Sequence, residues 1–224
     1  MELNGSTGYY LSLSEALALA RTDAYRGCTL TVLRSSTDPI SVNSGSFTLT
    51  AAQGVMLGGK VTLAKDAAVT LSGGSYTSSA SIFGSNRIEG GTFYGAVALQ
   101  DGSSVSGGSF LGAVTISDTV TVTGGTFTGD VTITNGGKLV ASAGTFGSVT
   151  VQSGGGGALT GGHFGEITQN DGSPCAALLA EGCAYSDGGI INGYVPIVGG
   201  VDVVPHAQHQ YVWLNQKLLC GCGH

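Results

Sequence analysis

Aromatic residues recur at a nearly constant interval along the middle of the chain. Five phenylalanines, each preceded by Gly-x, follow one another with steps of 17, 17, 19 and 18: Phe93, Phe110, Phe127, Phe146 and Phe164. Tyr76, in the stretch GGSYTSS, extends the series backwards by one more step of 17. A fixed period of this size is typical of solenoids, in which each repeat buries its apolar face only against neighbouring repeats.

The residues of one repeat predict short β-strands. In 124–140, GGTFTGDVTITNGGKLV, Val131 and Ile133 alternate with threonines, and 135–137 form a turn signal. The paired glycines are expected at corners, where a positive φ or a close approach of two backbones is needed. Such short strands cannot bury their apolar faces alone, but in a coil each strand pairs in parallel with its equivalent ~4.8 Å away.

We therefore predict an all-β fold, a single-stranded parallel β-helix (β-solenoid) whose turns have the length of the sequence period, about 17–19 residues. The irregular step and the phenylalanine column favour the right-handed form over the left-handed hexapeptide form. Apolar side chains are expected to stack inside the coil in columns, one of which contains Val97, Val114, Val131, Val149 and Ile167.

The composition agrees with an ordered repeat protein and excludes some partners. Only 10% of the residues are charged, 42% are hydrophobic, and the net charge is −6 with no run of Lys or Arg. This balance predicts no nucleic-acid partner and no insertion into a membrane. The opening residues lack the basic start and apolar run of a signal peptide. We expect a domain excised from a larger multidomain chain, with Met1 added.

The two ends of a solenoid need covers, because an open end exposes apolar side chains and unpaired backbone. Ser12 and Glu15 form a capping box for a helix over about 13–23. The predicted layout is a cap in 1–29, turns of the β-helix in 30–172, a C-terminal cap with a small β segment in 173–204, and a His/Cys tail in 205–224. The stretch PCAALLAEG is expected to form a short helical lid, and 187–189 a turn.

Two long segments resemble a known family. The segments YLSLSEALALARTDAYRGCTLTVLRSS and LLAEGCAYSDGGIINGYV…VDVVPHAQH…CGCGH are similar to the opening and closing parts of pectin-lyase-like β-helix domains in large surface proteins of Gram-positive anaerobic bacteria. The resemblance implies a secreted or wall-associated protein. It also implies a multidomain protein, with adhesion or glycan contact as its usual role. The regular turns, with small neutral residues outward and no converging acid, base and cation, predict a non-catalytic module that acts as a rigid stalk or as an adhesin-like binding face for a glycan or a host or cell-surface protein.

Stacking turns the sequence period into spatial columns of side chains. Asp101, Asp118 and Asn135 each stand eight positions after their phenylalanine, so the two aspartates are expected ~5 Å apart at one corner. Such a pair could hold Ca²⁺ or act as the acid and nucleophile of a glycoside hydrolase. The alternative interpretation is that Asp and Asn occupy these positions because they tolerate turn geometry.

A second column contains Asp130 and Glu166, two turns and so roughly 10 Å apart. This spacing slightly exceeds that of inverting glycosidases, and we expect no Arg or Lys in either column to support a lyase. If the chain is an enzyme, Asp101, Asp118, Asp130 and Glu166 are therefore its candidate catalytic residues. Tyr94 is the candidate for stacking on a sugar.

Outward threonines form a further column: Thr115, Thr132, Thr150 and Thr168. Regular threonine arrays order water in ice-binding solenoids, which makes ice binding a minor alternative function. Gln152 and Asn170 interrupt the array, and the preference of threonine for strands also explains the column.

The cysteines and histidines suggest one structural metal site and one crosslink. His206, His209, Cys220 and Cys222 form a set of nitrogen and sulfur ligands suited to structural Zn²⁺. In an oxidising setting, Cys175 and Cys183 could form a disulfide around the expected lid. Cys28 would remain a buried apolar residue or a free thiol.

Overall fold

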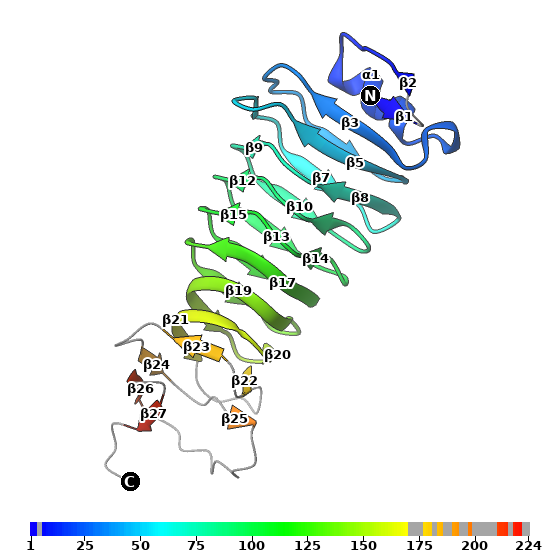
Figure 1. Cartoon of the computed structure of the whole chain (residues 1–224). Helices are drawn as coiled ribbons and strands as arrows, with labels where there is room; N and C mark the ends of the chain where they lie inside the picture. Colours follow the sequence, from blue (N-terminus) through cyan, green and yellow to red (C-terminus); the bar gives the residue numbers. More distant parts are fainter. Residues whose placement is uncertain are drawn as a thin grey trace.

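The chain folds into a parallel β-solenoid of about 8 turns, with one short helix and 7% helical content. In the computed structural model the turns are stacked along one axis, and the N-terminal helix lies over one end (Figure 1). The structure describes residues 1–3 and 6–169 and, beyond them, the backbone of six short strands. The predicted fold class is confirmed.

Each turn of the solenoid contributes strands to three faces. Face 1 consists of β3 (Cys28–Val32), β5 (Gly45–Ala51), β8 (Ala67–Leu71), β11 (Arg87–Ile88), β14 (Ser104–Val105), the first parts of β17 (Thr119–Phe127) and β19 (Lys138–Val151), and β20 (Gly156–Leu159). Face 2 consists of β6 (Met56–Leu57), β9 (Ser75–Tyr76), β12 (Thr92–Phe93), β15 (Ser109–Phe110), the end of β17, the middle of β19 and the start of β21 (Gly162–Gln169). Face 3 consists of β4 (Ile40–Val42), β7 (Val61–Leu63), β10 (Ala80–Ile82), β13 (Val97–Leu99), β16 (Val114–Ile116), β18 (Val131–Ile133) and the ends of β19 and β21.

The aromatic residues stack in the interior as the period predicts. Phe93 pairs with Phe110 and Phe110 with Phe127 in the parallel register. From Tyr76 to Phe164, successive ring centroids lie 4.5–5.0 Å apart with interplanar angles of 3–8°. All six rings are buried, so the column forms a continuous aromatic core next to face 2.

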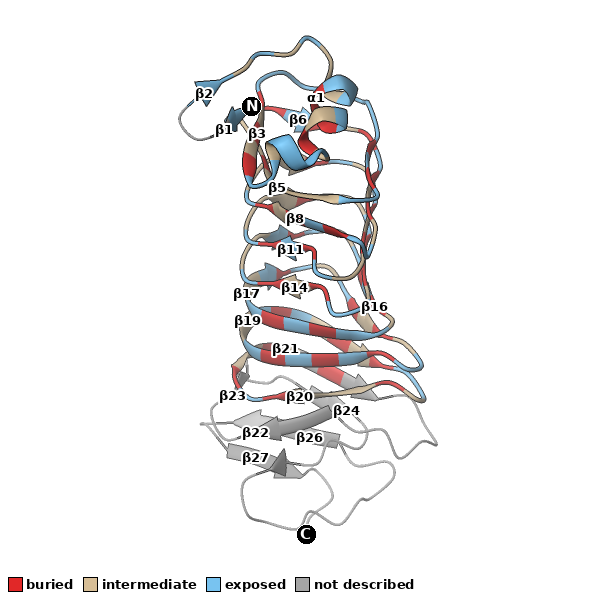
Figure 2. Cartoon of the chain, turned by 90° about the vertical axis from the view of Figure 1, so that its right-hand side faces the viewer, coloured by how far each residue is buried: buried red, intermediate tan, exposed pale blue. Residues whose placement is uncertain are grey.

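The strands alternate between buried and exposed side chains. Along β17, Val120 and Val122 are buried, whereas Thr119, Thr121 and Thr123 are exposed. The same alternation is visible along β17, β19 and β21 in Figure 2. The predicted column from Val97 to Ile167 lies inside the coil, and all five of its members are buried.

The paired glycines occupy corners, and each member of a pair is needed for a different reason. Gly125 adopts a φ of 101°, which a side chain would strain. A Cβ atom on Gly124 would lie 2.3 Å from the carbonyl oxygen of Ser106 in the previous turn. The double glycine therefore permits both the turn and the close approach of successive coils.

The early turns differ in length, and a buried asparagine bonds to the backbone where they differ. Ile82 pairs with Leu63, a step of 19, but Ile88 pairs with Leu71, a step of 17. Asn86 lies at this corner, where its amide oxygen accepts from the Val69 backbone N–H at 2.8 Å. Its amide nitrogen donates to the carbonyl of Ala64 at 2.8 Å and to that of Phe83. The segment from Leu63 to Leu71 is two residues longer than the segment from Ile82 to Ile88 that pairs with it. The Asn86 side chain replaces the backbone pairing that these two additional residues interrupt.

The N-terminal cap contains β1 (Glu2–Leu3), β2 (Ser6–Thr7) and α1 (Leu13–Ala20). The Glu15 backbone N–H donates to the Ser12 hydroxyl at 3.3 Å, which confirms the N-cap half of the predicted capping box. The buried side of α1 covers the first coil. The helix ends at Ala20, earlier than expected, and a 3-10 turn, η1 (Asp23–Tyr25), follows. Among the described residues, no helix is long and apolar enough to cross a bilayer.

Parallel pairing continues past residue 172. Four strands extend it: β22 (Ala177–Ala180), β23 (Cys183–Tyr185), β24 (Ile190–Asn192) and β25 (Ile197–Val198). The expectation of a helical lid in PCAALLAEG is wrong, because β22 pairs with β20 as a further strand of face 1. The strands β26 (Gln210–Leu214) and β27 (Lys217–Cys220) then form an antiparallel pair. The turn expected at 187–189 lies outside the described residues.

We expect Phe127→Ala to lower the free energy of unfolding by about 3–5 kcal/mol, because it removes a ring between two stacked neighbours. Thr126→Ala, on the outer side of the same strand, should change it by no more than about 0.5 kcal/mol. Urea denaturation followed by far-UV circular dichroism measures both variants. Equal effects of the two substitutions would contradict the role of the aromatic column.

We expect Tyr76→Phe to protect the fold selectively at alkaline pH. Burial raises the pKa of the Tyr76 phenol above its ordinary value of about 10, so the folded state holds the proton that the unfolded state loses. The associated stability is present below pH ~10 and is lost as the pH rises further. At pH 7 the variant loses only the bond to the Gly73 carbonyl, a change of about 1 kcal/mol. Thermal melts between pH 7 and 11 should show a shallower decline for the variant than for the parent chain.

Candidate functional site

The two aspartates of the first predicted column lie at equivalent positions in successive turns. Leu99 pairs with Ile116 before the corner, and Ser104 pairs with Thr121 after it, so the step of 17 holds on both sides. The Gly102 backbone N–H also donates to the Thr119 carbonyl at 2.9 Å across the corner. The backbones of Asp101 and Asp118 are therefore about one strand spacing, ~4.8 Å, apart, as the sequence predicts.

The two corners nevertheless have different local structures. Asp101 adopts a φ of 53° and forms a closed turn, in which the Ser103 N–H donates to the Gln100 carbonyl at 3.1 Å. At Asp118, one carboxylate oxygen accepts from the Thr119 N–H at 2.6 Å. Asp and Asn are the residues that tolerate such conformations and bond to nearby backbone. Both aspartates thus have a role in turn geometry, whatever else they do.

A lysine shares this column, contrary to our expectation. Because Leu63, Ile82 and Leu99 are paired in successive turns, Lys65 lies at the position equivalent to Asp101, two turns away. Gly84 occupies the turn between them, where a Cβ atom would lie 2.5 Å from the Lys65 carbonyl oxygen. The corner column therefore contains one cation and two carboxylates along the solenoid axis.

The second predicted column is confirmed in the backbone. Val131 pairs with Val149, and Ser148 pairs with Glu166, so Asp130 and Glu166 lie two turns apart, roughly 10 Å. Asp130 is exposed, and its backbone carbonyl accepts from the Val114 N–H at 2.8 Å. The Glu166 side chain lies outside the described residues. Ser148 separates the two acids, so this column presents no adjacent acid pair.

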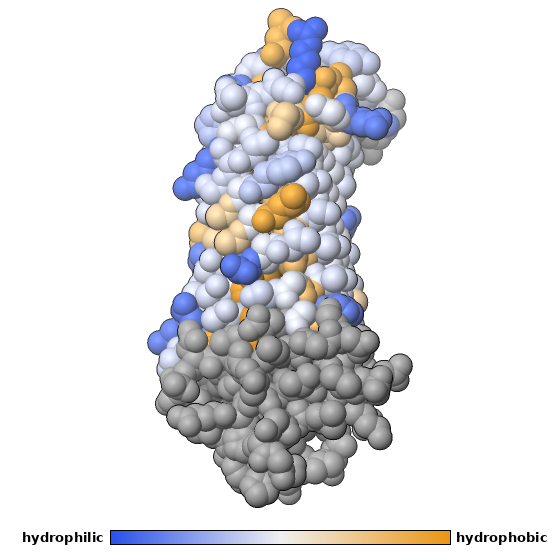
Figure 3. Space-filling model, turned by 90° about the vertical axis from the view of Figure 1, so that its left-hand side faces the viewer, coloured by the Kyte–Doolittle hydropathy of each residue, from blue (hydrophilic) through white to orange (hydrophobic). Residues whose placement is uncertain are grey.

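Tyr94 lies beside an exposed leucine at the corner that follows face 2. The pairing of Phe93 with Phe110 places Leu111 at the equivalent position of the next turn, and the two side chains are 52% and 49% exposed. The face around β9, β12 and β15 is otherwise mostly near-neutral in hydropathy, with small apolar patches (Figure 3). Tyr94 and Leu111 form a small apolar contact surface, which we call the corner patch.

Two outward columns of hydroxyl residues run along the solenoid, and one of them was predicted. On face 3, the predicted residues Thr115, Thr132, Thr150 and Thr168 are paired in register, and Ala98 separates them from Ser81. On face 2, the aligned hydroxyl residues are uninterrupted over five turns: Ser75, Thr92, Ser109, Thr126 and Thr145. His163 ends this second column. The surface of the solenoid is thus built mainly from small, uncharged polar groups.

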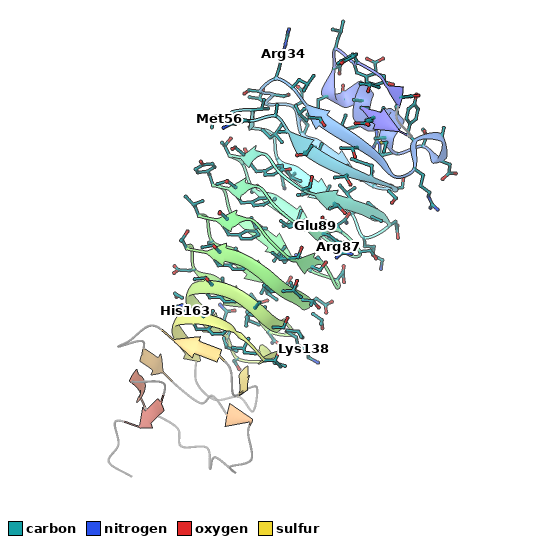
Figure 4. The ribbon with its side chains drawn as sticks, viewed as in Figure 1. Arg34, Met56, Arg87, Glu89, Lys138 and His163 are labelled. Atoms are coloured by element: carbon teal, nitrogen blue, oxygen red, sulfur yellow. The ribbon has the colours of Figure 1, made fainter. Side chains whose placement is uncertain are left out.

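The few charged side chains on the faces are scattered. Arg87 and Glu89 form an exposed ion pair at 3.7 Å. They lie along one edge of the solenoid with Lys138, whereas Arg34, Met56 and His163 lie along the other (Figure 4). Among the residues that the structure describes, no group of three or more His, Cys, Asp or Glu side chains is arranged to hold a metal ion.

The predicted zinc and disulfide sites lie outside the described residues. Of the residues in these two sets, the structure places only the backbones of Cys183, in β23, and of Cys220, in β27. Cys28 is a free, buried thiol at the start of β3, and burial raises its pKa. It is therefore protonated at neutral pH and packs as an apolar residue, which is one of its two predicted roles.

A cavity of about 620 Å³ at the N-terminal end was not predicted from the sequence. It is bordered by Tyr9, Tyr10 and Leu11 from the cap and by Thr31 and Leu33 from the first coil. Tyr9 is 80% exposed and Leu33 58% exposed, and a side-chain hydrogen bond with Tyr25 raises the pKa of Tyr10. The signal in the sequence is Leu33, which breaks the alternation of CTLTV by placing an apolar residue outward.

Comparison with known proteins identified no relative of this chain: no protein-family model, no curated protein and no solved structure matches it.

We expect substitutions at Asp101 to separate its role in the turn from a role in chemistry. Asp101→Ala should lower the free energy of unfolding by about 1 kcal/mol, because alanine at a positive φ is strained. Asp101→Asn should be nearly neutral, because asparagine tolerates this conformation. Chemical denaturation of the two variants measures the difference. If asparagine costs as much as alanine, the carboxylate itself has a stabilising contact.

Proposed function

We propose that this chain is a non-catalytic β-helix module of a bacterial cell-surface protein. It acts as a rigid stalk or presents an adhesin-like binding face to a glycan or to a host or cell-surface protein. The full protein is secreted or attached to the cell wall. The module needs no cofactor.

The observation that carries this proposal is the contrast between core and surface. The core is a continuous stack of buried apolar columns, including six parallel aromatic rings. The faces are made mainly of small uncharged side chains, with the ion pair of Arg87 and Glu89 on one edge. A rod with a solid core can hold other parts of a protein at a fixed distance. The extended surfaces of solenoids also serve as contact areas for partners.

The cap supports placement in the pectin-lyase-like group of surface-protein domains. In that group a short helix precedes the first strand, and here α1 packs against β3, β4 and β5 at the end of the stack. The likeness concerns arrangement and pattern. It supports the proposed location through that group's occurrence in surface proteins, and fold alone does not assign a ligand.

One observation favours a second candidate, a polysaccharide-active enzyme. The corner column brings Lys65, Asp101 and Asp118 onto one line, which supplies a cation that a lyase or hydrolase site could use. Against this candidate, Gly84 separates the lysine from Asp101 by two strand spacings. The carboxylate of Asp118 also bonds to its own turn. We therefore keep catalysis as the alternative.

The test is a glycan-array screen of the purified chain, with release of reducing ends assayed on every glycan that binds. We expect binding without release. Tyr94→Ser should reduce binding at least severalfold if the corner patch stacks on a sugar, whereas the control Tyr9→Ser, on the cap, should leave it unchanged. Release of new reducing ends that is lost in Asp101→Asn or Asp130→Asn would overturn the proposal in favour of the enzyme. Absence of both binding and release would leave the stalk role and protein partners.

A further inference from the structure

Five outward residues in two successive turns are apolar, although the turns on either side are polar at the same positions. The apolar residues are Tyr94, Ala96 and Ala98 in one turn and Leu111 and Ala113 in the next. The equivalent residues are Thr77, Ser79 and Ser81 in the turn before them, and Thr128, Asp130 and Thr132 in the turn after them. We call the five apolar residues the two-turn patch, which contains the corner patch.

The members of the two-turn patch lie next to one another around the corner between faces 2 and 3. The Leu111 backbone N–H donates to the Phe93 carbonyl at 2.8 Å, on the face 2 side of the corner. The Val97 N–H donates to the Ala113 carbonyl at 2.9 Å, on the face 3 side. Tyr94 is 52% exposed, and the alanines of the corner are exposed as well. The patch is therefore one continuous apolar area with an aromatic ring in it.

The size of the two-turn patch favours a small ligand over a protein partner. It extends over two strand spacings along the axis and five residues along the chain, which is on the order of 150 Å². A stable protein–protein interface buries roughly 800 Å² on each partner. The patch is well below that size, and hydroxyl residues border it along the axis at Thr77 and Thr128. Its area matches the flat faces of a few sugar rings.

An aromatic ring bordered by hydroxyl residues suits a pyranose sugar. A pyranose has C–H groups on its flat faces and hydroxyl groups around its edge, so a face can pack on Tyr94 while the edge bonds to polar side chains. Thr92 and Ser109 border the patch on face 2, and Thr115 borders it on face 3. Because the hydroxyl column of face 2 continues straight along the axis, it favours an extended glycan chain.

The charges near the two-turn patch select against an acidic sugar. Asp130 is exposed and follows Ala113 in the same column, one strand spacing of ~4.8 Å away. Lys60 also belongs to this column, but it lies two turns before Ala96, roughly 10 Å away. A carboxylate bound over the alanine of the second turn would therefore lie much closer to Asp130 than to Lys60 and would be repelled. A neutral sugar can instead donate a hydroxyl group to Asp130.

We propose that the two-turn patch binds an extended chain of neutral hexoses along the solenoid axis. One sugar ring stacks on Tyr94, Leu111 and the alanines provide further apolar contact, and Asp130 excludes uronic acids. The inference rests on the binding-face form of the proposed function and names the ligand class of that face.

The binding experiment uses the whole chain and two probes that differ only in charge. One probe is cellotetraose, and the other is the same tetrasaccharide oxidised to a carboxylate at each C6 position. We expect cellotetraose to bind saturably, with amide shifts in ¹⁵N NMR spectra that centre on Tyr94, Ala96 and Leu111. The oxidised probe should bind more weakly by about fivefold or more at low ionic strength, and salt should narrow this gap because it screens the repulsion. Equal or tighter binding of the oxidised probe would overturn the proposed ligand class.

Variants that restore the repeat locate the site. The double substitution Tyr94→Thr and Leu111→Thr gives both turns the residue of their neighbours, and it should lower the affinity for cellotetraose by about tenfold or more. The control is Val140→Thr, which replaces an exposed apolar residue of face 1 by the residue equivalent to Thr121 and should leave the affinity unchanged. Asp130→Asn should remove most of the difference between the two probes. Thermal melts establish that each variant is folded.

The outcomes separate this inference from the proposed function. Shifts that centre on another part of the solenoid, or an affinity that survives the double substitution, would overturn the two-turn patch as the site. Failure of cellotetraose to bind at millimolar concentration would also overturn the inference, and the glycan array then shows separately whether the binding-face function stands. Release of reducing ends would overturn the non-catalytic function, whereas shifts at Tyr94 would still support the patch.

Discussion

Every other property of this molecule depends on the parallel, in-register pairing of each strand with its equivalent one turn away. This pairing stacks similar side chains of successive turns, so Phe93 lies over Phe110 and Val97 lies over Val114. A slip of one residue would turn each apolar side chain outward and each threonine inward, which makes the register strongly specified. The aromatic column adds contacts that only the correct register permits, because its rings stack at 4.5–5.0 Å.

The same constraint explains what could be predicted from sequence. Where the step is regular, as between Phe93 and Phe127, the period alone places Asp101 beside Asp118. The period did not predict the pairing where turns differ in length. Because the turn that pairs with the segment around Asn86 contains two additional residues, the sequence period did not show that Lys65 is aligned with Asp101. It also failed at the ends, where ALLA has good helix formers but the free edge of β20 provides a ladder to join. The cavity beside β3 depends on how the N-terminal cap packs against the first coil, which the sequence period does not predict.

A solenoid with a solid core has few places for a specific site. The interior is filled by columns of buried side chains, and the faces repeat the same small residues from turn to turn. Departures from the repeat are therefore the informative positions. The corner patch of Tyr94 and Leu111 is one, the line of Lys65 and Asp101 is another, and the end of the stack is the third. At the end of the stack, the outer edge of β3 is paired by β1 only at Thr29 in the described part of the chain.

That end shows a consequence of building a rod from parallel strands. Each coil pairs with the backbone of the coil before it and covers its apolar side chains. The first coil must therefore be paired and covered by residues outside the repeat. Helix α1 covers its apolar interior, and β1 pairs with Thr29, but neither element reaches Thr31. The end of the stack is therefore built from elements that do not follow the repeat, whereas the faces continue it from turn to turn.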